Sequence, residues 1–157
     1  MDLQVSEEEL NAVKLAVQLG RENILLLLNA SERIIKNSEG DLKKQWEEKA
    51  NGLTQELVAM ERGMEKSGLL QDRIDVNGIR SISLEEERAI GNMIRHARNA
   101  CEHEVHFYFL SDKEVDQEHV EALKQKGRDT LREVERGAWK LVNLGVVHER
   151  YQEEYYG

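Results

Sequence analysis

The sequence contains no proline and a single cysteine, Cys101, and aromatic side chains make up only 5% of its 157 residues. One cysteine excludes an intrachain disulfide framework and a zinc site built from several thiolates. Because proline breaks helices and is common in loops, its absence favours long helices joined by few loops. The longest apolar run is the five residues 24–28, whereas a membrane-spanning helix needs about 20. We therefore expect a helical cytoplasmic protein with no membrane partner.

Charge of one sign prevails, since 31 acidic residues outweigh 22 basic ones and leave a formal net charge of −9. This balance argues against sequence-independent binding along a nucleic-acid backbone, which needs clustered lysine and arginine. The length fits one domain. We expect a single helical domain over residues 1–147, followed by a polar C-terminal tail over residues 148–157.

Two local signals mark helix starts. Ser6 and Glu9, and again Ser83 and Glu86, have the spacing of a capping box, in which each side chain accepts a hydrogen bond from the other's backbone. Downstream of these signals, apolar residues recur every three or four positions. The sequence predicts an all-α antiparallel bundle of about four long helices, over residues 7–36, 41–66, 83–110 and 111–144.

Three of these helices carry heptad-like stripes of apolar residues, which serve a bundle core or the interface with another helix. The stripe of the second helix, which we call the 42–64 seam, keeps its phase across Asn51-Gly52, so we expect one continuous helix there. Residues 24–28 are apolar on all sides, which predicts a central position in the bundle or coverage by a second chain. The sequence thus favours a homodimer. The 42–64 seam consists of Leu42, Trp46, Ala50, Leu53, Leu57, Met60 and Met64.

The linker over residues 67–82 is the only segment that lacks a helical pattern. Within it, Asn77-Gly78 is the dipeptide preferred in two-residue turns between antiparallel strands. Val76 and Ile79 flank this turn, and Asp75 would face Arg80 across the strands. We predict a small hairpin-like linker over residues 74–80 between the second and third helices.

Polar side chains gather on one stripe of the third helix. His96, Asn99, His103 and His106 fall within about 80° on a helical wheel, and Arg95 lies beside them. Cys101 falls on the apolar face instead, where a buried and inert thiol is expected. His103 and His106 with Glu102 form a possible metal-binding group, but a third protein ligand would have to come from elsewhere. A solvated polar face is the alternative, and we expect no metal and no cofactor.

The segment Arg98-Asn99-Ala100-Cys101-Glu102-His103 fits the pattern R-x4-H with a polar residue after the arginine. It resembles the R-x(4–6)-H motif of HEPN domains, which are all-α bundles, often dimeric, many of them metal-independent RNases. The resemblance implies that His103 would act as general acid or base on a ribose 2′-hydroxyl. It further implies that Arg98 would hold the scissile phosphate and that Asn99 would support it. A degenerate bundle that binds RNA or a nucleotide without cleaving it is a variant of this hypothesis.

The competing hypothesis is a non-enzymatic regulatory or adaptor protein that acts by protein–protein contact. Long apolar stripes on acidic helices suit a partner helix as well as an intramolecular core. The net charge of −9 would steer the chain toward basic surfaces, so inhibition of a basic partner is one such role. We favour this function over the RNase, under which alone RNA would be a partner.

Overall fold

The computed structural model describes residues 5–110 and 117–149, without the side chains of residues 102–110, 117 and 119. The described residues contain α-helices and one short 3₁₀ helix and no strand, which confirms the all-α class. The predicted fourth-helix start at residue 111 lies outside them, as do residues 150–157 of the predicted tail. In chain order the elements are α1 (Glu7–Lys36), α2 (Gly40–Ser67), η1 (Leu69–Gln71), α3 (Val76–Arg80), α4 (Leu84–Leu110) and α5 (Gln117–Asn143).

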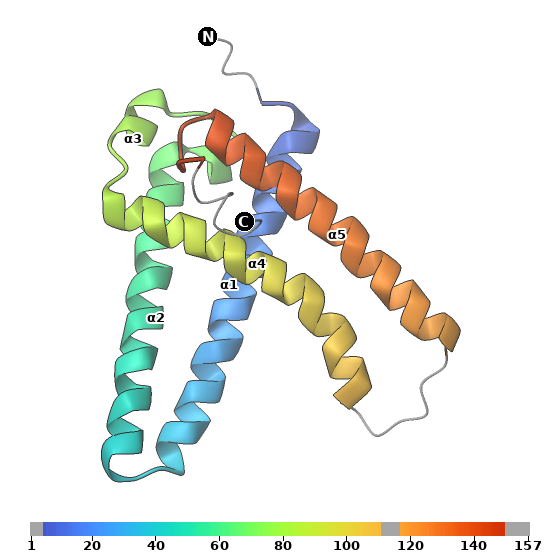
Figure 1. The fold of residues 1–157 in the computed structure, drawn as a ribbon. Helices are drawn as coiled ribbons and strands as arrows, with labels where there is room; N and C mark the ends of the chain where they lie inside the picture. Colours follow the sequence, from blue (N-terminus) through green and yellow to red (C-terminus); the bar gives the residue numbers. More distant parts are fainter. Residues whose placement is uncertain (1–4, 111–116, 150–157) are drawn as a thin grey trace.

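The four long helices form two pairs that meet at one end of the molecule (Figure 1). α1 and α2 run antiparallel as a helical hairpin, and α4 crosses this hairpin in the half away from the loop that joins α1 to α2, which we call its base. α5 packs on the first half of α1 and on α4. Away from the common end, the α1–α2 hairpin and the α4–α5 pair diverge, so the bundle is open rather than closed along its length.

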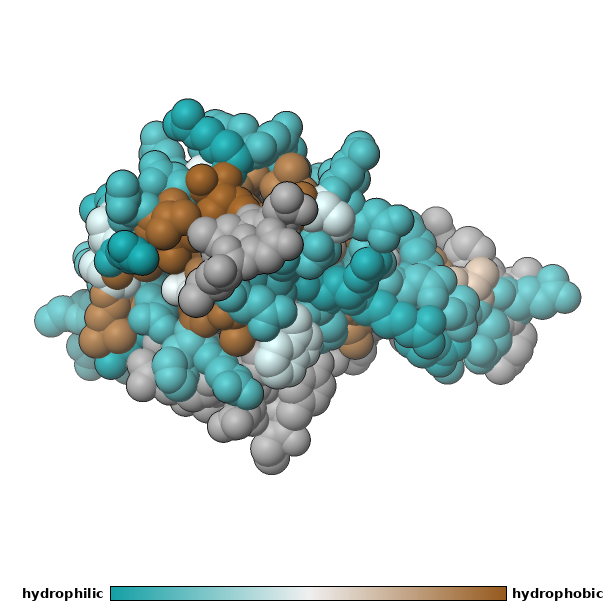
Figure 2. All heavy atoms as spheres, turned by 90° about the horizontal axis from the view of Figure 1, so that it is seen from above, coloured by the Kyte–Doolittle hydropathy of each residue, from teal (hydrophilic) through white to brown (hydrophobic). Residues whose placement is uncertain are grey.

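The hydrophobic core lies where the four long helices meet. Methionines supply much of it, and Met60, Met64 and Met93 are fully buried. Cys101 is buried as predicted and packs with alanines of α1 and α4 and a valine of α5. Viewed from above, apolar surface gathers at this end of the molecule (Figure 2). The arm on the right of the view, where α4 and α5 project, is covered mostly by hydrophilic residues. Aliphatic residues packed around the methionines include Val13, Val17, Ile90, Ile94 and Leu141.

Both predicted capping boxes are present. The backbone N–H of Glu9 donates to Ser6 Oγ over 3.1 Å, and the backbone N–H of Ser6 donates to Glu9 Oε1 over 3.2 Å. Ser83 and Glu86 repeat this arrangement at the start of α4, with distances of 3.1 and 2.8 Å. Each box satisfies backbone donors that a helix start leaves unpaired.

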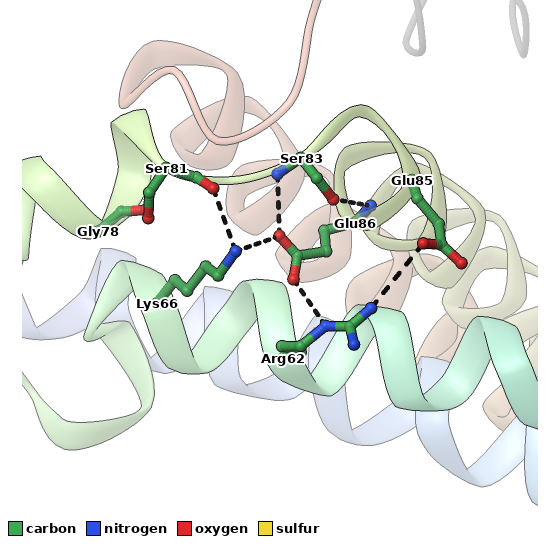
Figure 3. Close-up of polar contacts among 7 residues, drawn as sticks. All are labelled: Arg62, Lys66, Gly78, Ser81, Ser83, Glu85 and Glu86. Atoms are coloured by element: carbon green, nitrogen blue, oxygen red, sulfur yellow. Dashed lines mark hydrogen bonds and ion pairs between the residues drawn. The ribbon is translucent and has the colours of Figure 1, made fainter.

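Glu86 also joins α4 to α2. Its carboxylate is 1% exposed and accepts hydrogen bonds from Lys66 Nζ over 2.6 Å and from Arg62 Nε over 2.8 Å (Figure 3). Burial acts to raise the pKa of Glu86, but the bonds from Lys66, from the backbone of Ser83 and from Arg62 outweigh it and lower the pKa to about 2. The carboxylate is therefore held in its charged form at the junction of the two helices.

The predicted strand hairpin over residues 74–80 is wrong, because this segment contains the short helix α3. Asp75 caps α3 by accepting a hydrogen bond from the backbone N–H of Gly78 over 2.9 Å. A Cβ atom at position 78 would lie 1.8 Å from the carbonyl oxygen of Lys66. Glycine is needed here because α3 packs closely on the end of α2, and not because the chain reverses at a strand turn.

Candidate interaction surface

Of the predicted polar stripe of α4, the side chains of His96, Asn99 and Arg95 are described. His96 faces the α1–α2 hairpin, where its Nδ1 lies 3.0 Å from Oδ1 of Asn23 and its Nε2 lies 3.4 Å from Oε1 of Glu56. Asn23 is buried and His96 nearly so. The imidazole thus links three helices, α1, α2 and α4, at the edge of the core.

Arg98 faces a different helix. Its guanidinium forms a two-pronged ion pair with the carboxylate of Glu135 on α5, with 3.0 Å between Nη2 and Oε2. Arg98 itself is buried. This pair fixes α4 to α5, whereas His96 contacts α1 and α2.

Of the other residues of the predicted polar stripe, Asn99 is half-buried and Arg95 is exposed. The side chains of His103, His106 and Glu102 lie outside the described part of the chain, so the RNase motif and the candidate metal site stay predictions. Within the described part of the chain, no three histidine, cysteine or acidic side chains come together as metal ligands would.

Sequence reasoning missed a row of basic residues on α5. They recur every fourth position, and this period places them on one face of the helix. Four of them, from Arg128 to Lys140, line a groove of about 760 Å³ beside Trp139. Acidic side chains lie within ion-pair distance of four of them, for example Glu9 at 3.1 Å from Lys140 and Glu133 at 3.3 Å from Arg136. Arg136 and Lys140 thus join α5 to Glu8 and Glu9 at the start of α1, whereas Lys124 and Arg132 pair with acidic residues of α5 itself. It consists of Lys124, Arg128, Arg132, Arg136 and Lys140.

The far half of the α1–α2 hairpin has almost no core of its own. Over the 28 residues from 25 to 52, Ser31 alone is buried. The predicted central position of residues 24–28 in the bundle is wrong, since Ile24 is buried but the next three leucines are exposed, and coverage by a second chain stays a prediction. The physical reason is that α4 crosses α1 at Gly20 and Asn23 and then diverges from the hairpin, so α4 does not cover the part of α1 that follows Ile24.

The exposed apolar side chains of this half form what we call the hairpin surface. Leu26 is 61% exposed and Leu42 is 53% exposed. Trp46 is half-buried beneath the ammonium group of Lys49, which lies 4.7 Å from the ring centre. Large apolar side chains left exposed in one part of a protein are typical of a binding surface. The hairpin surface consists of Leu25, Leu26, Leu27 and Leu42.

No protein-family model matches this chain, and neither a curated protein nor a solved structure is detectably similar to it. The described helices include none with the length and apolar composition of a transmembrane segment.

Proposed function

We propose that this chain is a non-catalytic adaptor that acts by protein–protein contact, with the hairpin surface as its binding surface. The supporting observation is the exposure of leucines over a 28-residue stretch that buries Ser31 alone. Two helices packed on each other bury only the faces that they turn toward one another, so leucines that stay exposed need further coverage, and helix-on-helix docking is the usual way of supplying it. An adaptor needs this surface and no catalytic group.

Charge supports a second part of the proposal, that a basic partner protein contacts the acidic residues outside the far half of the hairpin. Residues 25–52, the far half of the hairpin, carry five acidic and five basic side chains, which cancel. The formal charge of −9 therefore lies in the rest of the molecule, which we call the acidic body. An acidic body steers association with basic surfaces. The proposed compartment is the cytoplasm, where a single buried thiol and no disulfide are in keeping with reducing conditions.

The first experiment compares what the full-length chain and its variants capture from a cell lysate. Leu26→Glu places a charge on the hairpin surface, whereas the control Leu84→Glu places the same charge on an exposed leucine at the start of α4. We expect proteins that bind the parent and the Leu84→Glu variant but not the Leu26→Glu variant. If no captured protein shows this selectivity, the hairpin surface is not the binding surface.

The second experiment tests the absence of catalysis. The purified chain is incubated with RNA in EDTA, beside a His103→Ala variant, and we expect no cleavage by either. Cleavage by the parent that disappears in the variant would replace the adaptor proposal with an RNase. Arg98→Ala is a poor probe here, because removing one partner of a buried ion pair costs about 3–5 kcal/mol of stability whether or not the residue is catalytic.

A further inference from the structure

The 42–64 seam of α2 continues beyond the part of the molecule that covers it. Leu53, Met60 and Met64 in its second half are buried where α4 packs on α2. In its first half Leu42 is exposed, and Trp46 and Ala50 are only half-buried. The spacing of apolar residues is the same in both halves, so the uncovered half has the pattern of a helix-packing face.

α1 changes in the same way at the same level of the hairpin. Ala16, Val17 and Ile24 are buried, whereas Leu25, Leu26 and Leu27 are exposed. The hairpin thus has four-helix packing at its base and only two helices at its far end (Figure 1). Two further helices, arranged as a hairpin, would complete a four-helix bundle at that end.

The charge of the far half favours a second copy of this chain as the source of those helices. Its charged residues, which lie between Glu32 and Lys49, number five acidic and five basic and cancel. Two copies that approached through their acidic bodies would repel each other, but two hairpin ends meet without net repulsion. A neutral hairpin offers no electrostatic preference to a strongly basic or acidic helix.

The arrangement of charges on α2 is also self-complementary. Lys43 and Glu47 are both exposed and lie one helical turn apart. A two-fold axis that crosses α2 between them, with the two α2 helices antiparallel, would place Lys43 opposite Glu47 of the second copy. The same axis would form the reciprocal contact, as two-fold interfaces require.

We propose that a second copy of this chain covers the hairpin surface, so that two α1–α2 hairpins form an intermolecular four-helix bundle. The inference rests on the proposed function in that it names the occupant of the same surface. The acidic bodies, each with its α4–α5 pair, lie at the outer ends of this dimer and stay accessible to a basic partner, whose capture Leu26→Glu weakens by separating the two binding copies.

Sedimentation velocity of the full-length chain over a wide concentration range tests the inference. We expect the parent to reach twice the chain mass of 18.2 kDa. Leu42→Glu should raise the dissociation constant at least about tenfold, because each dimer loses two buried leucines and buries two charges instead. Leu84→Glu is a matched control, since Leu84 and Leu42 are both 53% exposed, and it should dimerise as the parent does.

Circular dichroism of each variant verifies that its helices remain, and Leu26→Glu replaces Leu42→Glu if the latter unfolds. A parent that stays monomeric at the highest concentration would overturn the inference, as would a dimer that neither hairpin variant weakens. The adaptor proposal fails separately. A monomeric parent that still captures a lysate protein through Leu26 would remove the second copy alone, whereas a dimer that captures nothing else would leave the dimer and remove the adaptor role.

Discussion

At the scale of single residues, Gly20 determines how closely α1 and α4 approach. A Cβ atom at this position would lie 2.5 Å from the backbone oxygen of Met93 and 2.6 Å from its Cγ. Gly52, in the middle of α2, has no such neighbour within 4 Å. The two glycines are equally costly in helix propensity, so packing alone separates their roles.

Alanine at these two positions should therefore change stability in opposite directions. We expect Gly52→Ala to raise the free energy of unfolding by about 1 kcal/mol, the gain in helix propensity. Gly20→Ala should lower it by about 1–3 kcal/mol, because the added methyl group forces the two helices apart. Urea unfolding followed by circular dichroism measures both. A stabilised Gly20→Ala variant would show that α1 and α4 do not cross this closely in solution.

At the scale of elements, local signals decided what the sequence could predict. The boxes at Ser6 and Ser83 involve residues three apart, and both helix starts follow from them. The error at Asn77-Gly78 arose because Asp75 caps a helix over the same short distance, and because Gly78 packs on Lys66, twelve positions earlier. The local signals of a strand hairpin and of a helix start overlap in this segment, so only the contact of Gly78 with α2 distinguishes the two structures.

Glu86 makes the junction of α2 and α4 sensitive to acid. Its pKa in the folded chain is about 2, below the ordinary value of 4.5. The unfolded chain therefore binds a proton more readily, and the stabilisation is complete above pH 4.5 and is lost as the pH falls toward 2. Full loss corresponds to roughly 3 kcal/mol.

Urea unfolding at a series of pH values between neutrality and the acid limit should show this loss as a falling free energy of unfolding. Glu86→Gln should be less stable than the parent at neutral pH, and its stability should fall less steeply on acidification. Glu85→Gln is the control, since Glu85 is exposed and approaches Arg62 only to 3.9 Å. Equal pH dependence in the parent and in Glu86→Gln would contradict the assigned pKa.

At the scale of the whole molecule, the sequence predicted the helices but not which of their faces stay uncovered. Leu42 and Met60 belong to one seam and are equivalent by pattern, but Met60 is buried in the core with residues of α4 and Leu42 is exposed beyond the path of that helix. The contacts made by polar residues of α4 were unpredictable for a similar reason. The partners of His96 and Arg98 lie on other helices, 73 and 37 positions away for Asn23 and Glu135, and no local signal pairs residues at such separations.

The proposed dimer brings a last prediction, which concerns the pairing of Lys43 with Glu47 across the two-fold axis. Lys43→Glu should weaken the dimer, because two carboxylates then face each other at both symmetric contacts. Glu47→Lys should weaken it equally through facing ammonium groups. The double variant restores opposite charges and should dimerise as the parent does. Exposed ion pairs contribute about 0.2–1 kcal/mol each, so a several-fold change in dissociation constant is expected, larger at low salt.

Net charge alone predicts a different outcome. Glu47→Lys changes the formal charge by two units, from −9 to −7, and would strengthen association if general repulsion between copies controlled it. Weakening by this variant therefore indicates a specific contact, and sedimentation equilibrium at two ionic strengths measures it. If the double variant remains as weak as the single ones, α2 does not pair with its copy about an axis between these two residues.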